Sequence, residues 1–552
     1  MPTSPNAPVV FDLGIPKAAL QTAALRSLPD VTAMHVVISF KLNAAVLSQF
    51  AQDPRMRAGQ RIDVAALANQ VGITDQVYRQ MSQFFGGPGV TLHLHKLHTS
   101  MTLDATAGVL AARLHTRFMY HSYQGSMFYA PFPAITLPAS LARSIQGISG
   151  LDSFSRYQSP TSAPDLRPLS SRLAQAGCVN DYDVLTNQQI SRAYGLTQLY
   201  NRGWTGKGMT IVLPEFAAFS QRDVQTYMDC VGYRGKLSVV NVDGAPPSNT
   251  DDEAALDIEM VAGLAPDADI VVYQASSGHD YTVFWQRFQD MFNRISDDYS
   301  GHTQPVLVSV SWGDTEGYLT TNMLKSIDNT LETLTTVEHV NVFVASGDCG
   351  AYDSRDYPNT LDVGFPGSDP YVIGVGGTFL YVDGQGRRTR EIAWDEDPRK
   401  HPTCKNEWGS GGGLSAVFPR PAWQQTYPGI QNKYSDGFRQ VPDVAASAYY
   451  DSVFLNGQWY YSGGTSAAAP MWAAGYALVE QGLVRTTGYY VAGPAVLYTL
   501  ASKYASTKPF YDIVKGTNLY YPATPGWDFT TGLGSPNMAG VYQGLQQLVQ
   551  GA

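Results

Sequence analysis

Residues 462–470 read SGGTSAAAP and are expected to join a tight turn to the start of a helix. The two glycines allow a close backbone approach, and the small and apolar residues 467–479 are typical of a buried helix. Pro470 fits among the first four amides, which have no partner within a helix. Ser466 would then lie where amides and the helix dipole stabilise negative charge. Taken alone, the stretch fits a capped core helix better than a nucleophile.

The chain before this stretch alternates between strands and helices. We expect strands at 209–214, 237–242, 269–273, 306–311 and 340–345, and helices at 221–231, 253–262, 282–295 and 321–334. Continuous apolar strands joined by helical crossovers predict a parallel sheet covered on both faces, which is a doubly wound α/β domain. Functional residues gather at the carboxyl ends of such strands.

The first part of the chain predicts a separate, smaller unit. Residues 1–34 are expected to form a loosely ordered lead-in, and residues 35–152 favour a small α+β sandwich. Over residues 151–173 the composition shifts to Ser, Pro, Gln and Arg, which is typical of a linker and of a site of proteolysis.

Three histidines of this unit, His93, His95 and His98, raise the question of a metal site. Two of them lie on one face of a strand expected at 90–95, because alternate residues of a strand share a face. No acidic or cysteine partner adjoins them in the sequence, so an ordinary sheet surface is favoured over a metal site.

Composition narrows the class of protein. The chain has 552 residues, of which 44% are hydrophobic and 15% charged, as in a globular protein with large cores. The formal net charge of -10 argues against a nucleic-acid partner, and no apolar run is long enough to predict a membrane span. The N-terminal region lacks the uninterrupted apolar centre of a signal peptide. If oxidised, the four cysteines allow three pairings: Cys178, Cys230, Cys349 and Cys404.

Two carboxylates share one face of an expected helix. Glu253 and Asp257 lie four residues apart, whereas Glu259 points elsewhere. Like charges at this spacing destabilise an isolated helix, which indicates a shared proton or a functional role. Asp348 follows another apolar strand in the sequence Ser-Gly-Asp, where a functional acid and a turn-forming cap are equally compatible with the pattern.

Histidine is missing where a serine nucleophile would ordinarily need it. None of the histidines after the linker has the His-Gly-Thr setting of the subtilisin type: His279, His302, His339 and His401. A serine without histidine needs another base, and a carboxylate serves if burial raises its pKa toward the working pH.

These candidate residues occur together with further motifs. The motifs are Gly464-Thr465-Ser466 with Pro470, Glu253 with Asp257, Ser346-Gly347-Asp348, Phe365-Pro366-Gly367-Ser368-Asp369, Ser410-Gly411-Gly412-Gly413, Val441-Pro442-Asp443 and Gly526-Trp527-Asp528. Taken together and in their order along the chain, they resemble the kumamolisin-like members of the sedolisin, or serine-carboxyl peptidase, family over nearly the whole chain. The first unit resembles the activation propeptide of that family.

The resemblance implies a fold and a division into domains. The expected catalytic domain is a subtilisin-like, doubly wound, mostly parallel sheet, preceded by a small α+β, ferredoxin-like prodomain. The implied order is a lead-in over 1–34, an activation propeptide over 35–152, a linker with the maturation site over 153–178, and a peptidase domain over 179–552.

The resemblance also implies catalytic roles. By similarity, Ser466 is the nucleophile, Glu253 is the base that takes its proton, and Asp257 orients Glu253 and shares charge with it. Asp348 resembles the acid of the oxyanion site and must be protonated to donate a hydrogen bond there. An optimum at about pH 3 to 5 follows, near the unperturbed carboxyl pKa values.

Two further sets of residues are implied by similarity. Glu215 and Trp312 match residues that extend the hydrogen-bond network behind the carboxylate pair. One structural calcium site is implied, with the hard oxygen ligands that Ca²⁺ prefers, at Asp512, Ile513, Thr524, Gly526 and Asp528. Thr524 stands where we expect glycine, a difference that matters if the position needs a positive φ.

The family implies a secreted, acid-active and self-processing zymogen. Its expected partners are protein or peptide substrates and its own propeptide, which acts as an intramolecular inhibitor; a monomer and endopeptidase rather than tripeptidyl-peptidase action are expected. Acid release of the propeptide through protonation of its carboxylates and histidines is a hypothesis; these histidines are His93, His95, His98, His115 and His121.

Three other classes compete with this interpretation. A non-catalytic scaffold that keeps the fold would most simply have lost one of the four candidate catalytic residues. A glycosidase that uses Glu253 and Asp257 leaves Ser466 unexplained, and carboxylates one helical turn apart are too close for an inverting enzyme. A subtilisin-type protease lacks its histidine motif here.

Overall fold

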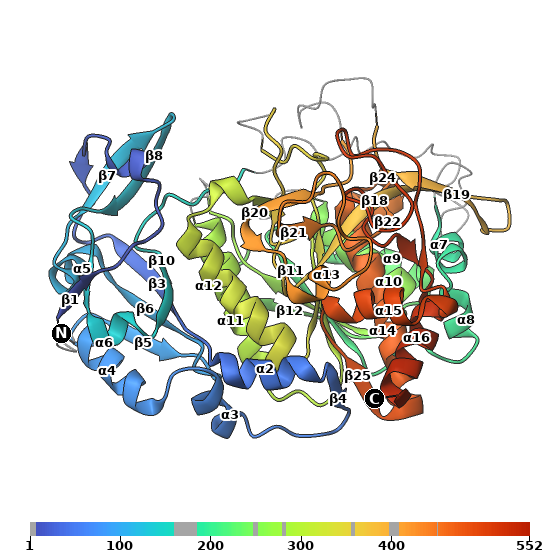
Figure 1. The fold of residues 1–552 in the computed structure, drawn as a ribbon, viewed down its shortest axis with the longest axis horizontal. Coiled ribbons are helices and arrows are strands. Elements are labelled where there is room, and N and C mark those ends of the chain that lie inside the picture. The colour runs from blue at the N-terminus through green and yellow to red at the C-terminus, as the bar shows by residue number, and fades with distance from the viewer. Residues whose placement is uncertain are drawn as a thin grey trace.

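An eight-stranded sheet forms the centre of the larger unit (Figure 1). The structure is a computed structural model that describes residues 7–158, 185–246, 252–278, 283–354, 359–396, 408–449 and 451–551. The strands lie in the order β12-β13-β11-β14-β16-β18-β19, and β22 also pairs with β18. All these pairs are parallel except the β18–β19 pair. The bounds are β11 Thr210–Glu215, β12 Leu237–Asn241, β13 Asp269–Gln274, β14 Val306–Val310, β16 Asn341–Ala345, β18 Ile373–Val382, β19 Arg388–Ala393 and β22 Val444–Ser447.

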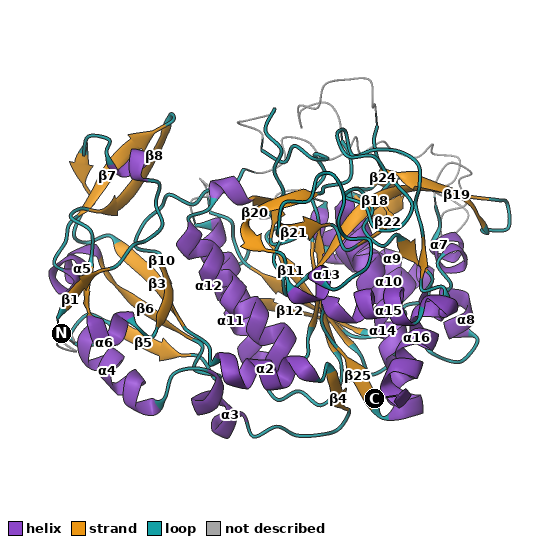
Figure 2. Ribbon diagram, in the orientation of Figure 1, coloured by secondary structure: helices purple, strands orange, loops and turns teal. Residues whose placement is uncertain are grey.

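Helices cover both faces of this sheet, which confirms the doubly wound α/β fold (Figure 2). Ile211 and Leu213 of β11 point into one core with α9, α10 and α14, while Val212 points into the other core with α11 and α12. The helices are α7 Asn187–Ala193, α8 Leu196–Tyr200, α9 Gln221–Val231, α10 Glu253–Leu264, α11 Phe284–Tyr299, α12 Thr321–Glu332, α13 Ala422–Gln425, α14 Thr465–Thr487, α15 Pro494–Lys503 and α16 Met538–Gly551. Within the described ranges, no helix combines the length and apolar character needed to cross a membrane.

The loops of this unit contain short two-stranded sheets. They are β15 Asp314–Thr315 with β17 Gly364–Phe365, β20 Gly413–Pro419 with β21 Phe438–Val441, β23 Asp451–Leu455 with β24 Gln458–Ser462, and β26 Phe510–Tyr511 with β27 Ser535–Pro536. The hairpin of β23 and β24 leads directly into α14.

The helix α14 runs through the middle of the first core. Every residue from Thr465 to Leu483 is buried, as the apolar run after Ser466 predicts. Pro470, however, is the sixth residue of the helix, so the expectation that it lies among the first four amides is wrong. The helix begins at Thr465, directly after the glycine pair, and the proline lies inside it.

The smaller unit contains a four-stranded antiparallel sheet with the order β10-β3-β6-β5. Numbered along the chain, these strands lie in the order 4-1-3-2, which is the ferredoxin-like arrangement that the sequence predicts. The strands of this unit are β3 Ala33–Phe40, β5 Thr91–Leu94, β6 Ser100–Thr106, β7 Phe118–Tyr123, β8 Ser126–Pro131, β9 Thr136–Pro138 and β10 Ile145–Ser149. Its helices are α2 Ala44–Gln52, α3 Val64–Val71, α4 Asp75–Phe85, α5 Ala107–Leu114 and α6 Ala139–Ala142.

The described part of the expected lead-in is packed into this unit rather than loosely ordered. Its elements are β1 Pro8–Val10, which pairs with β9, the short helix α1 Lys17–Leu20, and β2 Arg26–Ser27, which pairs with β7. Leu13, Ile15 and Leu28 are buried in the core of the unit. These apolar residues follow no regular period over the segment, which also contains Pro16, so sequence periodicity does not reveal them.

The sheet of the smaller unit lies against α11 and α12 (Figure 1). Beside α11 the contact is polar: Ser149 Oγ donates to Gln289 Oε1 at 2.5 Å, and the Gln289 amide donates to Ser39 Oγ at 3.2 Å. Elsewhere it is apolar, where Leu47, Val71 and Leu97 pack with Val337 of the larger unit. Strand β4 Arg55–Arg57 also pairs with β25 Tyr489–Val491 of the larger unit. Hydrogen bonds therefore join the two units at several separate points.

His35 contributes a charged contact to the same interface. Its Nδ1 lies 2.6 Å from Asp104 of its own sheet, and its Nε2 lies 3.0 Å from Asp290 on α11. Burial lowers the pKa of His35, but the hydrogen bonds and negative charges of Asp290 and Asp104 outweigh it and raise the pKa from 6.5 to about 9. The imidazole is therefore a cation at neutral pH.

We predict that His35 makes the stability of the full-length chain fall at alkaline pH. A histidine whose pKa is raised in the folded state adds its full amount to the free energy of unfolding below its unfolded pKa of 6.5. This added stability is lost as the pH rises through about 9. In urea unfolding between about pH 6 and pH 10, the parent should lose about 1–2 kcal/mol more than His35→Gln. His115→Asn, which alters an exposed histidine of the same unit, should follow the parent. Equal pH dependence of the parent and His35→Gln would contradict the assignment.

Candidate active site

Three neighbouring strands of the large sheet bring polar residues to their carboxyl ends. Glu215 is the last residue of β11, Ser311 and Trp312 follow β14, and Asp348 lies just beyond β16. Since β11, β14 and β16 are adjacent and parallel, these side chains share one edge of the sheet. Asp257 of α10 and the start of α14 reach the same edge through the contacts described below.

Two buried carboxyl groups lie in contact at this edge. The side chains of Asp257 and Glu215 are fully buried, and Trp312 Nε1 donates to Glu215 Oε2 at 2.8 Å. Burial raises the pKa of Asp257 well above its ordinary value; the charge of Glu215 and a hydrogen bond to it raise the pKa further, whereas Ser311 lowers it. Two such carboxyls share a proton most readily, because both cannot ionise cheaply away from water.

Ser311 links this pair to α14. Its hydroxyl lies 2.9 and 2.7 Å from the two carboxylate oxygens of Asp257 and 3.3 Å from the backbone oxygen of Ser466. Pro470 has no N–H, so the Ser466 carbonyl lacks its usual donor four residues later in the helix. The Ser311 hydroxyl lies where that donor is missing. Sequence reasoning overlooked Ser311, for which only its place between an apolar strand and Trp312 was a signal.

Asp348 lies against the first residue of the same helix. Its Oδ1 accepts hydrogen bonds from the backbone N–H of Thr465 at 2.8 Å and from its hydroxyl at 2.7 Å. The Gly347 N–H donates to the same hydroxyl at 3.2 Å. Gly464 has φ 92°, and a Cβ at that position would lie 2.6 Å from Asp348 Oδ2. The glycine is thus required both by the backbone conformation and by the approach of the carboxyl group.

Glu253 begins α10, one turn before Asp257 as predicted. It is half-buried, and α10 packs along α14. Glu259 points to another part of the core, where its carboxylate accepts the Phe454 N–H at 2.7 Å, and burial raises its pKa. The structure therefore brings Glu215, Asp257 and Trp312 into direct contact and joins Ser466 to them through Ser311.

The chain that leaves the smaller unit runs into this region. The backbone N–H of Arg156 donates to the Tyr318 oxygen at 3.1 Å, and the N–H of Gln158 donates to Asp314 at 2.6 Å. The Tyr157 ring stacks on Phe284 at 3.8 Å and lies in the same aromatic cluster as Trp312. Residues 159–184, which include most of the predicted linker with its maturation site, lie outside the described residues.

The expected calcium ligands lie around one loop. Asp512 Oδ2 accepts the Gly526 N–H at 3.0 Å, and Asp528 Oδ2 accepts the Thr524 N–H at 2.9 Å. Burial raises the pKa of Asp512 and raises that of Asp528 to about 7. Gly526 has φ 83°, whereas Thr524 has no positive φ, so the threonine fits its place. Two carboxylates beside one loop, with the carbonyls of that loop and of Ile513, form a set that suits a calcium ion.

Two of the four histidines after the linker lie in the described residues, and both form hydrogen bonds with residues outside the candidate active site. His302 contacts the Tyr299 oxygen at 2.8 Å and the Tyr490 hydroxyl at 3.2 Å, and His339 contacts the Val337 oxygen at 3.3 Å. His279 and His401 lie outside the described residues. Cys230 and Cys349 are disulfide-bonded, and Cys178 and Cys404 also lie outside the described ranges.

Comparisons with known proteins agree with this architecture. Residues 27–154 match the family model for the pro-kumamolisin activation domain, and residues 244–503 match the model for the subtilase family. The chain is 29% identical to kumamolisin of Bacillus sp. (strain MN-32), over 90% of this chain and 87% of that protein. It is 25% identical to sedolisin of Pseudomonas sp. (strain 101), over 94% of this chain and 88% of that protein.

Two further similarities are to a solved structure and to a fungal peptidase. The solved structure of Pseudomonas sedolisin, complexed with two molecules of pseudo-iodotyrostatin, covers 67% of this chain and 99% of its own, with a TM-score of 0.56 and 24% identity. This likeness supports the fold. The tripeptidyl-peptidase sed1 of Aspergillus fumigatus is 24% identical over 88% of this chain and 87% of that protein.

We predict that Gly464→Ala destabilises the protein more than a comparable change at Gly457. Both glycines have positive φ, but a Cβ at Gly457 meets nothing within 4 Å, whereas one at Gly464 meets Asp348. The free energy of unfolding should fall by about 1–3 kcal/mol in Gly464→Ala and by about 1 kcal/mol in Gly457→Ala. Urea unfolding at neutral pH measures both, and equal losses would disprove the close approach of Asp348.

Proposed function

The chain belongs to the sedolisin, or serine-carboxyl peptidase, family and carries a pro-kumamolisin activation domain, and on this basis we propose that it is a secreted, acid-active, self-processing endopeptidase. The observation that carries the proposal is the position of the Ser311 hydroxyl between Asp257 and the backbone of Ser466. It joins the buried carboxyl pair to the start of the helix that holds the proposed nucleophile.

In the proposed reaction, Ser466 Oγ attacks the scissile carbonyl carbon and Glu253 accepts its proton. The carbonyl π electrons move to the oxygen, and the tetrahedral intermediate then collapses and breaks the C–N bond. The leaving amine takes the proton from Glu253, and an ester on Ser466 remains. Water repeats these steps, which releases the acid product and restores the serine. Asp257 orients Glu253 and shares its charge, as a coupled carboxyl pair can.

Asp348 is proposed to donate a hydrogen bond to the oxyanion. Its carboxyl lies against Thr465, the residue before Ser466, beside the amides of the helix start, where negative charge is favoured. A carboxylate cannot donate, so Asp348 must be protonated. Activity at about pH 3 to 5 follows, because ordinary carboxyl groups take up a proton there.

The smaller unit is proposed to act as an intramolecular inhibitor. It is docked on α11 and α12, and the chain that leaves it fills the aromatic cluster around Trp312 with Tyr157. A substrate would have to displace this segment to approach the same edge. Cleavage beyond residue 158, followed by departure of the unit, would therefore open the site.

We further propose one structural calcium ion and an extracellular location. Calcium would be held by Asp512, Asp528 and the carbonyls of Ile513, Thr524 and Gly526. Its positive charge would balance the negative charge of the buried Asp528 carboxylate. The disulfide bonds at Cys230 and Cys349 favour an oxidising compartment.

Ser466→Ala should abolish both self-processing and substrate cleavage. We expect the parent, moved from pH 7 to about pH 4, to lose its first unit in intact-mass measurements, while Ser466→Ala stays whole and is slower on denatured protein by at least about a thousandfold. Ser502→Ala removes a hydroxyl that bonds only within its own helix and should behave as the parent. An active Ser466→Ala, or an inactive parent, would refute the catalytic proposal.

Cleavage of an N-acetylated peptide would distinguish an endopeptidase from a tripeptidyl-peptidase.

Removal of calcium should lower the melting temperature by several degrees, since an ion that binds only the folded state stabilises it. Asp512→Asn should melt at the lower temperature with or without calcium. Asp436→Asn, which changes a carboxylate bound to its own loop, should keep the calcium response. Scanning calorimetry with and without a chelator provides the test, and a parent indifferent to the chelator would argue against the site.

A further inference from the structure

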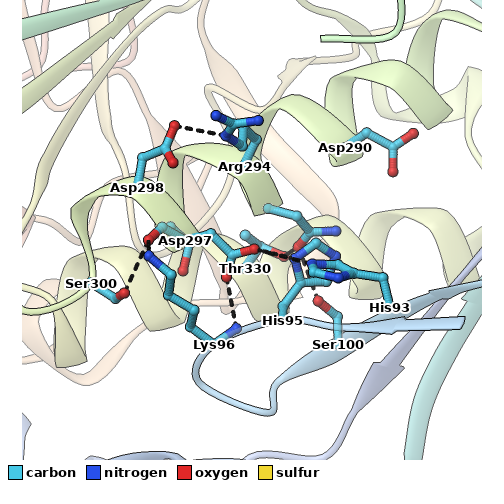
Figure 3. A network of polar contacts seen from close by, with 12 residues as sticks. His93, His95, Lys96, Ser100, Asp290, Arg294, Asp297, Asp298, Ser300 and Thr330 are labelled. Atoms are coloured by element: carbon cyan, nitrogen blue, oxygen red, sulfur yellow. Dashed lines mark hydrogen bonds and ion pairs between the residues drawn. The ribbon is translucent and has the colours of Figure 1, made fainter. Parts of the chain in front are cut away.

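One cluster of metal-binding side chains lies outside the candidate active site, at the interface of the two units (Figure 3). It consists of His93 on β5, His95 just after β5, and Asp297 on α11. In the sequence, no acidic residue adjoins these histidines. The structure supplies an acidic partner from the other unit.

The three side chains converge on a small volume. His95 Nδ1 lies 2.8 Å from Asp297 Oδ2, and His93 Nε2 lies 3.7 Å from the same oxygen. One ligand atom from each residue lies within 4.8 Å of the others. A tetrahedral zinc site with bonds of about 2.0 Å separates its ligands by about 3.3 Å, a value between the two observed distances.

The position of Asp297 is fixed independently of the histidines. Its second carboxylate oxygen, Oδ1, accepts the Lys96 N–H at 2.7 Å, and the Lys96 ammonium binds the backbone oxygen of Asp297 rather than its carboxylate. Such a second hydrogen bond orients a metal-binding carboxylate. Oδ2 is thereby left facing the two imidazoles.

Access and ligand chemistry also fit a metal ion. The His93 side chain is 63% exposed, whereas those of His95 and Asp297 are 11% and 12% exposed, so the cluster opens to solvent on one side only. An ion could enter there and keep water as its fourth ligand. Two imidazoles and one carboxylate favour zinc over calcium or magnesium, which prefer oxygen alone.

The spacing of two aspartates on α11 matches the spacing of the strands that carry the histidines. Asp290 and Asp297 are seven residues apart on α11, a rise of about 10.5 Å. The strands β3 and β5 are separated by β6, and therefore by about 9.6 Å. The helix thus presents one aspartate to His35 on β3 and the other to the histidines on and after β5.

We propose that His93, His95 and Asp297 form a zinc site that bridges the two units. Because the ligands come from both units, zinc binds only the docked arrangement and stabilises it. The site holds the first unit in place and slows its departure from the larger unit. This inference does not depend on the catalytic roles proposed above.

The test is zinc titration of the full-length, tag-free chain, kept intact by Ser466→Ala, at about pH 7.5, where free imidazoles are mostly neutral. Excess calcium is present so that the loop of Asp512 and Asp528 does not compete. Calorimetry should show one zinc per chain, and zinc should raise the melting temperature. His115→Asn, which changes a remote exposed histidine, should bind zinc as the parent does.

His93→Gln and His95→Gln should each weaken zinc binding at least tenfold. Asp297→Asn should do the same, because it removes the ligand that the larger unit supplies. His93 is mostly exposed, so its variant keeps the test decisive if His95→Gln fails to fold. A parent that binds no zinc, or any of these three variants that binds it as tightly as the parent, overturns the proposal.

Discussion

The buried carboxyl of Asp257 is the group on which the other parts of the candidate site depend. A carboxyl removed from water is stable only with partners, and Glu215 and Ser311 supply them. Those partners lie at the ends of two neighbouring strands, so the register of the sheet determines the position of the Asp257 carboxyl group. Ser311 also contacts the carbonyl that Pro470 leaves without a donor. A helix irregularity, a strand end and a carboxyl pair are thus parts of one arrangement.

Much of the fold could be predicted because its signals are local. The predicted bounds of α9 agree with the structure, and this helix follows Ser220, whose side chain caps it by accepting the Asp223 N–H. Five strands of the large sheet, β11, β12, β13, β14 and β16, are continuous apolar runs, and their predicted bounds are correct to within one residue. The strands β18, β19 and β22 were not predicted. Glu253 and Asp257 could be chosen because their spacing alone places them on one helix face. The catalytic roles of these residues stay predictions.

What sequence reasoning missed depends on residues far apart in the chain. Ser311 has no motif of its own, and it gains a role only because Ser466 folds back against it. Asp297 follows His95 by about two hundred positions, and no local pattern connects them. The packed lead-in is similar, since its short strands pair with β7 and β9 rather than with each other. Periodicity within a window carries no information on such pairings.

The hydrogen bonds between the sheet of the smaller unit and the helices α11 and α12 have a consequence for solubility. Across this contact, Ser39 and Ser149 hydrogen-bond to Gln289, and Asn322 donates to the Ile148 oxygen. If the units part, water can take the place of each of these partners. Apolar side chains would be newly exposed at Leu47, Val71, Leu97 and Val337, which pack together across the two units. Because water replaces the hydrogen-bonded part of the contact, only this remaining part adds apolar area through which the separated products could aggregate.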